Sequence, residues 1–279
     1  MPTTRLDGGP FATLARGLLA AIAAFTVLDA GAASAQFSRF EPFDTDLGAW
    51  DTLFGAQSDG FDIGWSDSSF AGAASGEFGG LFVRVNQPTG DLSMPRALDT
   101  ASFAAPVDLD EPFHAEGWMF LDDDSDDAGL DVHVGFFREN NPTNERVVIR
   151  ILPNGGDAWC FRMAVNASQG TRIDAPLGFD SVPLSWSFDW TPSGAGDGTG
   201  IAVGSVSDGV TTLTLPTPFV GANAATIDSF GVWANSASAT DPTRTQSMYF
   251  DDVTYTVPEP AAALTGAIAL VALARRRRR

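Results

Sequence analysis

Apolar and polar residues alternate at period two along the middle of the chain. The alternation is clearest in LSWSFDW, residues 184–190, which places leucine, two tryptophans and a phenylalanine on one face. This pattern is typical of a half-buried β-strand. The same alternation runs through residues 130–137, 145–152 and 158–165. Weaker strand patterns are found at residues 81–85, 113–121, 201–206, 210–214, 228–234 and 247–256.

Turn-forming clusters separate these strand patterns. NNPTN, LPNGGD and SGAGDGTG are examples, and the 29 glycines and 17 prolines are spread along the chain. No segment between residues 36 and 256 sustains the apolar period of a helix, and neither a repeat nor a linker divides it. The pattern predicts one all-β domain over residues 36–256, an antiparallel β-sandwich.

The order of elements resembles the concanavalin A-like (laminin-G-like) jelly roll over about residues 100–256. The resemblance lies in EGWMFL, GFF, RVVIRILPNGGDAWCFRMAV, SWSFDWTPSGAGDGTG, IDSFGVWAN and MYFDDVTYT, in that order. It implies a jelly-roll sandwich and a glycan-binding role. A galactose-binding-type jelly roll is the alternative, because FEPFDTDLGAW near the start of the domain could pair with the closing FDDV.

The last 23 residues have three parts: Val257 followed by Pro258-Glu259-Pro260, an uncharged Ala- and Leu-rich run over 261–274, and five arginines. As a helix the run would span about 21 Å at about 1.5 Å per residue, less than the roughly 30 Å of a bilayer core. Arginines of this kind remain on the cytoplasmic side. Residues 257–279 resemble the PEP-CTERM sorting signal of bacterial surface proteins. The resemblance implies processing by the membrane transpeptidase exosortase near Pro258, Glu259 and Pro260, with transient anchoring through 261–274.

The first 35 residues have the features of a secretory signal peptide. Two arginines precede an apolar run over 17–27, and Ala33 and Ala35 form the small-x-small pattern that signal peptidase cleaves. We therefore expect a signal helix before the sandwich and a short apolar helix after it. We expect an exported protein of a bacterial cell surface or extracellular matrix, anchored transiently in the inner membrane.

Charge restricts the partners of the domain. The chain has a net charge of −19 and no lysine, and residues 36–258 hold 32 acidic residues against nine arginines, a net charge near −23. Such a surface repels nucleic acid and attracts divalent cations. The single cysteine, Cys160, cannot form an intramolecular disulfide, and its alternating surroundings predict a buried core position.

Motifs for catalysis are missing from the sequence. Glucanases of the concanavalin A-like type carry Glu-x-Asp-x-x-Glu, and the nearest segment, EPFHAE at 111–116, lacks the central aspartate. Only His114 and His133 could act as bases, and there is no nucleophile elbow. A zinc site of His114, Glu116 and His133 competes with exposed polar positions on a sheet. We therefore predict that the protein is not an enzyme, with a glycoside-active enzyme as the remote alternative.

Calcium is the cofactor that the sequence favours. DDDSDDAGLD supplies Asp122, Asp124 and Asp126, oxygen ligands of the kind that Ca²⁺ prefers, although a solvated acidic loop explains the same residues. A second candidate pairs Glu41 with Asp251 or Asp252, which a strand end with one capped carboxylate also explains.

Two functions remain open. The first is a structural protein of the cell envelope or matrix without catalytic activity, processed by signal peptidase and exosortase. The alternative is a lectin-like module that binds extracellular polysaccharide through Trp118, His133 or Trp233, provided that these side chains share a sheet face. Each tryptophan could instead be a core residue.

Overall fold

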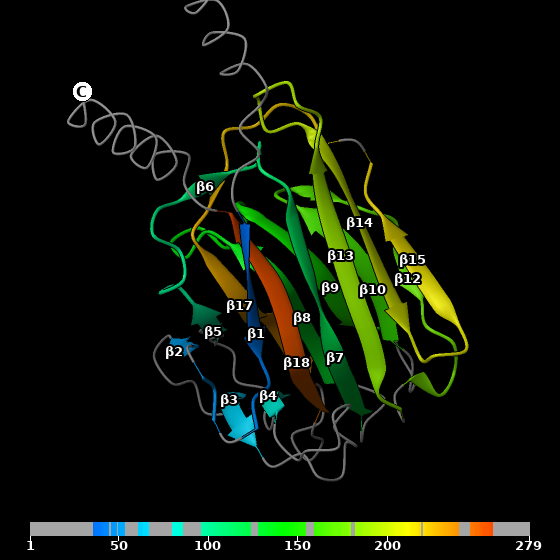
Figure 1. Ribbon diagram of the computed structural model, residues 1–279. Helices are drawn as coiled ribbons and strands as arrows, with labels where there is room; N and C mark the ends of the chain where they lie inside the picture. Colours follow the sequence, from blue (N-terminus) through cyan, green and yellow to red (C-terminus); the bar gives the residue numbers. More distant parts are fainter. Residues whose placement is uncertain are drawn as a thin grey trace, which may run out of the picture. The chain divides into compact units, whose positions relative to one another are not determined.

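The structure is a computed structural model, and β-strands are its regular elements (Figure 1). It describes residues 36–44, 46–48, 50–53, 61–66, 80–85, 96–123, 128–154, 159–179, 182–218, 220–239 and 246–258. The predicted terminal helices, the cleavage residues Ala33 and Ala35, and Glu259 and Pro260 lie outside these ranges. Within them, no helix is long and apolar enough to cross a membrane.

Two antiparallel sheets of eight described strands each form the sandwich, and the prediction of an all-β antiparallel sandwich is confirmed. Sheet A has the order β15-β14-β13-β7-β18-β4-β3, with β1 also paired to β18. Its strands are β1 (Gln36–Glu41), β3 (Phe61–Ser66), β4 (Gly80–Val85), β7 (Phe113–Asp123), β13 (Leu184–Pro192), β14 (Gly200–Ser207), β15 (Thr212–Pro216) and β18 (Gln246–Pro258).

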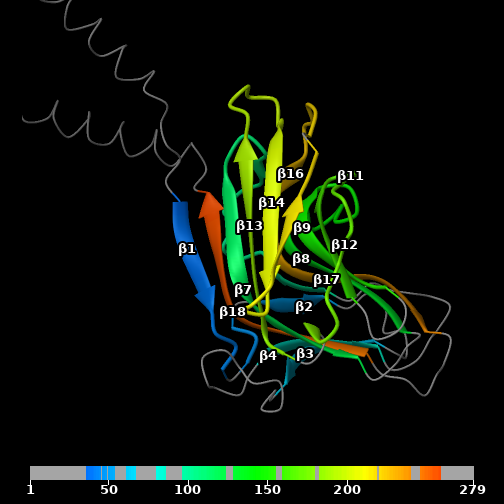
Figure 2. The ribbon, with the colours of Figure 1, turned by 90° about the vertical axis from the view of Figure 1, so that its right-hand side faces the viewer.

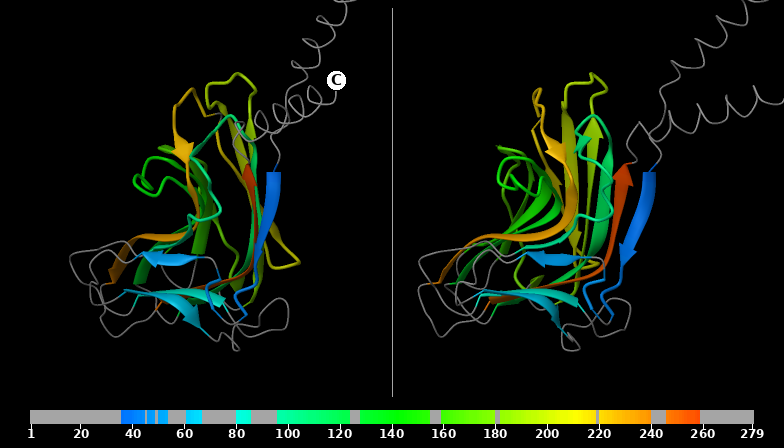
Figure 3. Two further views of the ribbon diagram at one scale, coloured as in Figure 1. Left: turned by 60° about the vertical axis from the view of Figure 1, so that its left-hand side comes forward. Right: turned by 90° about the vertical axis from the view of Figure 1, so that its left-hand side faces the viewer.

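Sheet B has the order β11-β10-β9-β8-β17-β5-β2, with β12 also paired to β10. Its strands are β2 (Asp51–Leu53), β5 (Arg96–Asp99), β8 (Ala128–Phe137), β9 (Arg146–Pro153), β10 (Trp159–Val165), β11 (Ser168–Gln169), β12 (Ile173–Asp174) and β17 (Ser229–Ala239). A small third sheet joins β6 (Val107–Asp108) to β16 (Thr226–Ile227). Figures 2 and 3 show sheets A and B as two facing layers.

Each of the ten strands predicted from alternation is present. In β13 the alternating residues Leu184, Trp186, Phe188 and Trp190 are buried in the core between the sheets, whereas Ser187 turns outward. Burying large apolar side chains is the main favourable term in folding, at about 1.5–3 kcal/mol for each side chain of this size. The strands that the pattern did not predict are short, except β1 and β3.

The first described strand lies beside the last. Gln36 of β1 faces Pro258 of β18, and Glu41 faces Val253. The chain therefore enters and leaves the sandwich at neighbouring positions. The pairing of FEPF with FDDV, which the galactose-binding-type jelly roll would imply, is present where Glu41 faces Val253.

Sheet B is buried on both faces, unlike sheet A. Its outward face carries a second apolar cluster, of Leu98, Phe137, Val148, Ala164 and Trp233. Cys160 is also buried, as predicted, and burial raises the pKa of its thiol. The outward positions also hold polar residues such as His133 and Arg150, so the apolar–polar alternation resembles that of a half-exposed sheet.

Candidate functional site

A hollow of about 340 Å³ opens on the outward face of sheet A. Trp118, which is 37% exposed, lines this hollow. The other lining residues are Glu116, Gly117, Ser185, Trp186, Ser187, Ser205 and Asp252. An exposed indole beside hydroxyls and carboxylates is the combination of groups that orients a polar ring-shaped ligand.

A β-bulge shapes this hollow. The pairing of β18 with β7 shifts between Asp251 and Thr254, and Asp252 takes a φ of 49°. Bulges redirect side chains and are frequent near functional sites. Gly117 lies opposite Trp186 at the same level, and a Cβ there would come within 3.1 Å of the Trp186 ring. The glycine therefore leaves room for the buried indole beneath the hollow.

A row of polar side chains continues from the hollow along the outward face. His114 Nδ1 lies 2.8 Å from Asp189 Oδ1, and His114 Nε2 lies 3.7 Å from Glu116 Oε2. All three side chains are exposed to solvent. This places a histidine within reach of a carboxylate on each side, next to the hollow.

The outward face of sheet B holds a different, buried polar cluster. His133 is 0% exposed, and its ring nitrogens lie 3.2 Å from Asp131 Oδ1 and 3.2 Å from an Arg146 guanidinium nitrogen. Arg150 donates two hydrogen bonds to Asp131, of 2.8 and 2.5 Å. Burial lowers the pKa of His133 to about 4, against the opposing effect of Asp131. The ring is therefore neutral at pH 7, accepting from Arg146 and donating to Asp131.

Aromatic packing holds this cluster in place. The Trp233 ring meets the His133 ring edge to face at a centroid distance of 5.0 Å, and Phe137 packs against Trp233 at 6.1 Å. The Arg146 guanidinium carbon lies 5.9 Å from the Trp233 ring centroid, a cation–π distance. Burial lowers the pKa of Arg146 to about 10, and the charge of Arg150 adds to this effect.

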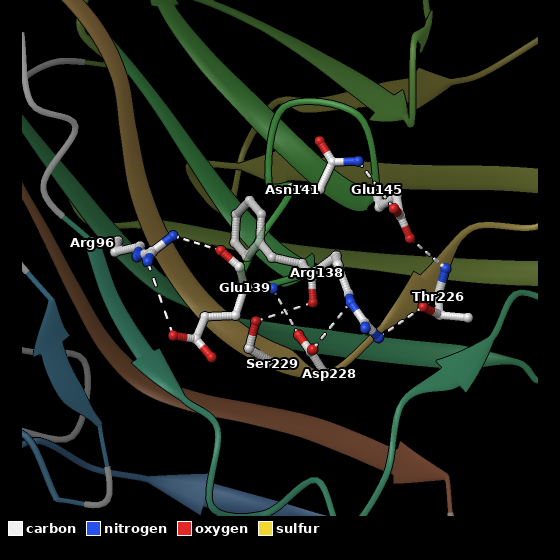
Figure 4. Close-up of polar contacts among 9 residues, drawn as sticks. Arg96, Arg138, Glu139, Asn141, Glu145, Thr226, Asp228 and Ser229 are labelled. Atoms are coloured by element: carbon white, nitrogen blue, oxygen red, sulfur yellow. Dashed lines mark hydrogen bonds and ion pairs between the residues drawn. The ribbon is translucent and has the colours of Figure 1, made fainter. Parts of the chain in front are cut away.

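The loop between β8 and β9 is fixed to its neighbours by a complete polar network (Figure 4). Arg138 pairs with Asp228, whose carboxylate also accepts from the Glu139 backbone N–H. Arg96 donates to the Glu139 carbonyl oxygen at 2.6 Å. Asn141 and Thr226 both donate to the Glu145 carboxylate. Each guanidinium in this network has a carboxylate within 4.0 Å.

The three predicted glycan-contact residues do not share a face. His133 and Trp233 face each other across β8 and β17 in sheet B, where Trp233 is 1% exposed. Trp118 lies on the outward face of sheet A. The proposed zinc ligands are divided in the same way, because His114 and Glu116 belong to sheet A and His133 to sheet B.

The described residues contain no group of three or more His, Cys, Asp or Glu side chains arranged to hold a metal ion. Asp124 and Asp126 lie outside the described residues, and of Asp122 only the backbone is described, in β7. Glu41 is buried and accepts a hydrogen bond of 2.8 Å from Arg39. Asp251 and Asp252 lie at the bulge of β18, one of them at the hollow.

No protein-family model matches the chain, and no curated protein is similar to it. Solved structures of similar fold do exist. A lectin, UEA-II complexed with galactose, is 12% identical with a TM-score of 0.51, over 81% of this chain and 99% of the lectin. This likeness shows the fold: an antiparallel sandwich close to the concanavalin A-like jelly roll.

Enzymes are also among the similar structures. A β-glucanase of Bacillus licheniformis is 14% identical, with a TM-score of 0.44 over 78% of this chain and 97% of the enzyme. An endo-β-1,4-glucuronan lyase of Trichoderma reesei is 13% identical, with a TM-score of 0.46 over 80% and 95%. The prediction that the protein is not an enzyme is contradicted by this set, which consists mainly of glucanases, lyases and hydrolases. A missing glucanase motif excludes one carboxylate pair and leaves other glycan chemistry open.

It was not predicted from the sequence that Glu116 and Asp252 line one hollow, or that arginines gather on the outward face of sheet B. A signal for the arginines was present. Arg146 and Arg150 stand four residues apart in an otherwise apolar strand, so they share a face, and Arg162 interrupts the next apolar strand. Arginine at interior strand positions is unusual, particularly in a chain without lysine.

Proposed function

We propose that the sandwich is a glycan-binding domain whose ligand lies in the hollow of sheet A. The observation that carries this proposal is the exposed Trp118 indole beside the hydroxyls of Ser185, Ser187 and Ser205 and the carboxylate of Glu116. The apolar face of a sugar ring packs against an indole, while its hydroxyls exchange hydrogen bonds with serine and carboxylate oxygens. Glycan binding also agrees with the lectins among the similar structures.

The test is a glycan array with the full chain, followed by titration calorimetry with the best neutral oligosaccharide. Trp118→Ala should weaken binding at least tenfold, which corresponds to about 1.4 kcal/mol. Phe40→Ala is the matched control, because Phe40 is also an exposed aromatic residue of sheet A but does not line the hollow. Equal affinity of Trp118→Ala and the unaltered protein would refute this site.

A glycoside-active enzyme is the second candidate, favoured by Glu116 and Asp252 lining the same hollow. Cleavage of a glycosidic bond requires one carboxyl group as acid and a second as base or nucleophile. His114 stands beside the first of these carboxylates, with its Nε2 3.7 Å from Glu116 Oε2.

This candidate is tested by the release of new chain ends from the polysaccharides that the array identifies. Glu116→Gln should abolish product formation while binding persists. A protein that binds but releases no product leaves glycan binding as the function of the hollow.

We further propose that the protein is exported and sorted to the bacterial cell surface or matrix. Ala33 and Ala35 would direct signal peptidase, and Pro258-Glu259-Pro260 with the apolar run and arginines would direct exosortase. Terminal mass spectrometry of native material should find Gln36 as the first residue and no arginine cluster. Recovery of intact Arg279 from the cell surface would overturn the sorting proposal and leave glycan binding untouched.

A further inference from the structure

A row of side chains crosses the outward face of sheet B at right angles to its strands. The register pairs Arg96 with Trp233, Trp233 with His133, His133 with Arg150, and Arg150 with Arg162. The row thus crosses β5, β17, β8, β9 and β10. At about 4.8 Å per strand, its four steps span about 19 Å.

Among the described residues, positive charge is in excess on this face. Asp131 is the described carboxylate that acts electrostatically on both Arg146 and Arg162, and Arg150 engages it through both oxygens. Arg162 forms no hydrogen bond or ion pair with any described residue, and the Nε atoms of Arg146 and Arg162 are buried without a partner. Arg96 and Arg138 of the neighbouring network, in contrast, each have a carboxylate partner.

This arrangement is unfavourable for folding alone. Like charges directly opposite on paired strands are destabilising, and Arg150 faces Arg162 in that way. A buried N–H donor without a hydrogen-bond partner, such as the Nε of Arg146 or of Arg162, costs about 1–3 kcal/mol. The cation–π contact of Arg146 with Trp233 compensates only in part. The domain nevertheless places three of its nine arginines here.

We propose that this face binds an anionic group, the carboxylate of an acidic saccharide, at Arg162 and Arg146. A guanidinium donates two parallel hydrogen bonds to a carboxylate, and a second guanidinium nearby adds to the attraction. Arg150, with 15% of its side chain exposed, and the partly buried Arg162 form the open end of the row. The site is distinct from the Trp118 hollow, and only the saccharide part of this inference rests on the proposed function.

The experiment uses the full chain and three probes: an oligoglucuronate, a neutral gluco-oligosaccharide of equal length, and inorganic sulfate. Calorimetry should show binding of the oligoglucuronate, weakened at least tenfold by Arg162→Gln and less by Arg162→Lys. Trp118→Ala should leave this binding unchanged, which separates it from the hollow. Arg39→Gln, which removes the same charge from sheet A, is the control for bulk electrostatics.

A thermal melt without ligand distinguishes a binding role from a structural one. Arg162→Gln should melt no lower than the unaltered protein, because it removes a charge that faces Arg150. A melting temperature several degrees lower would show that Arg162 supports the fold, and would overturn the proposal. Equal weakening by Arg39→Gln would do the same, as would equal affinity for the neutral oligosaccharide in the Trp118→Ala variant, in which the hollow no longer contributes. Sulfate binding as tightly as the oligoglucuronate would reduce the site to an adventitious ion only.

Discussion

His133 makes the stability of the sandwich depend on pH, because its ring stays neutral in the fold down to a pKa of about 4 against an ordinary value of 6.5. Above pH 6.5 the ring is neutral in both folded and unfolded chains, and the residue contributes nothing to the pH dependence. As pH falls below 6.5, only the unfolded chain gains the proton, so the fold loses stability. From these two pKa values the loss is about 2 kcal/mol at pH 5, and it levels off at about 3 kcal/mol below pH 4.

Urea unfolding at pH 7.5 and pH 5.0 measures this difference. His133→Gln keeps a donor and an acceptor for Asp131 and Arg146 but cannot titrate, so its free energy of unfolding should fall by about 2 kcal/mol less over that interval. His114→Gln is the control, since His114 lies on the exposed face of sheet A. Asp131, Arg146 and Arg150 are the charged groups that face the ring. An equal pH dependence in His133→Gln and the unaltered protein would show that burial of His133 is not the cause.

Three further predictions concern the fold and its ions. Gly135→Ala should destabilise the domain by about 3 kcal/mol, since Gly135 has a φ of 147° and a Cβ there would lie 2.4 Å from the Val147 carbonyl oxygen; a urea titration checks this. Cys160 should resist a thiol reagent in the folded protein and react in urea, because burial raises its pKa; a spectrophotometric thiol assay with matching rates in both conditions would contradict this. Ca²⁺ should raise the melting temperature by a few degrees more than Mg²⁺ at equal ionic strength, and Asp122, Asp124 and Asp126 changed together to Asn should remove the effect; if it survives, Glu41 with Asp251 or Asp252 is the better candidate.

The fold was largely predictable because long strands carry a readable period. β13 alternates over the seven residues from Leu184 to Trp190, and each inward position among them is buried. Strands such as β11 and β16 have two residues each and cannot show a period. The burial of the outward face of sheet B could not be predicted from the sequence either. From the alternation alone, Trp233 and Phe137 could be either exposed or buried. Only the packing of the strands shows that they belong to an apolar cluster.

The site was predictable only within single strands. Alternation gives the face of Trp118 relative to its own neighbours, but the partners of β7 are β13 and β18, which come from far along the chain. Whether Trp118 and Trp233 share a face therefore depends on which sheet each strand joins. The alternation of apolar and polar residues contains no information on sheet membership. The bulge at Asp252 could not be predicted from the sequence either, since it depends on a register mismatch with β7.

Net charge alone gives an incomplete account of what the domain attracts. Residues 36–258 have a net charge near −23, from which the sequence predicts divalent cations as partners. The arginines of sheet B form a local cluster of positive charge in this acidic domain. Because they are buried or partly buried, solvent screens their charges less. An acidic saccharide would therefore meet repulsion at long range and attraction at contact. Salt screens the long-range repulsion beyond about 8–10 Å but screens buried charge pairs much less. Moderate ionic strength thus favours, rather than weakens, the approach of an anionic polymer to this face.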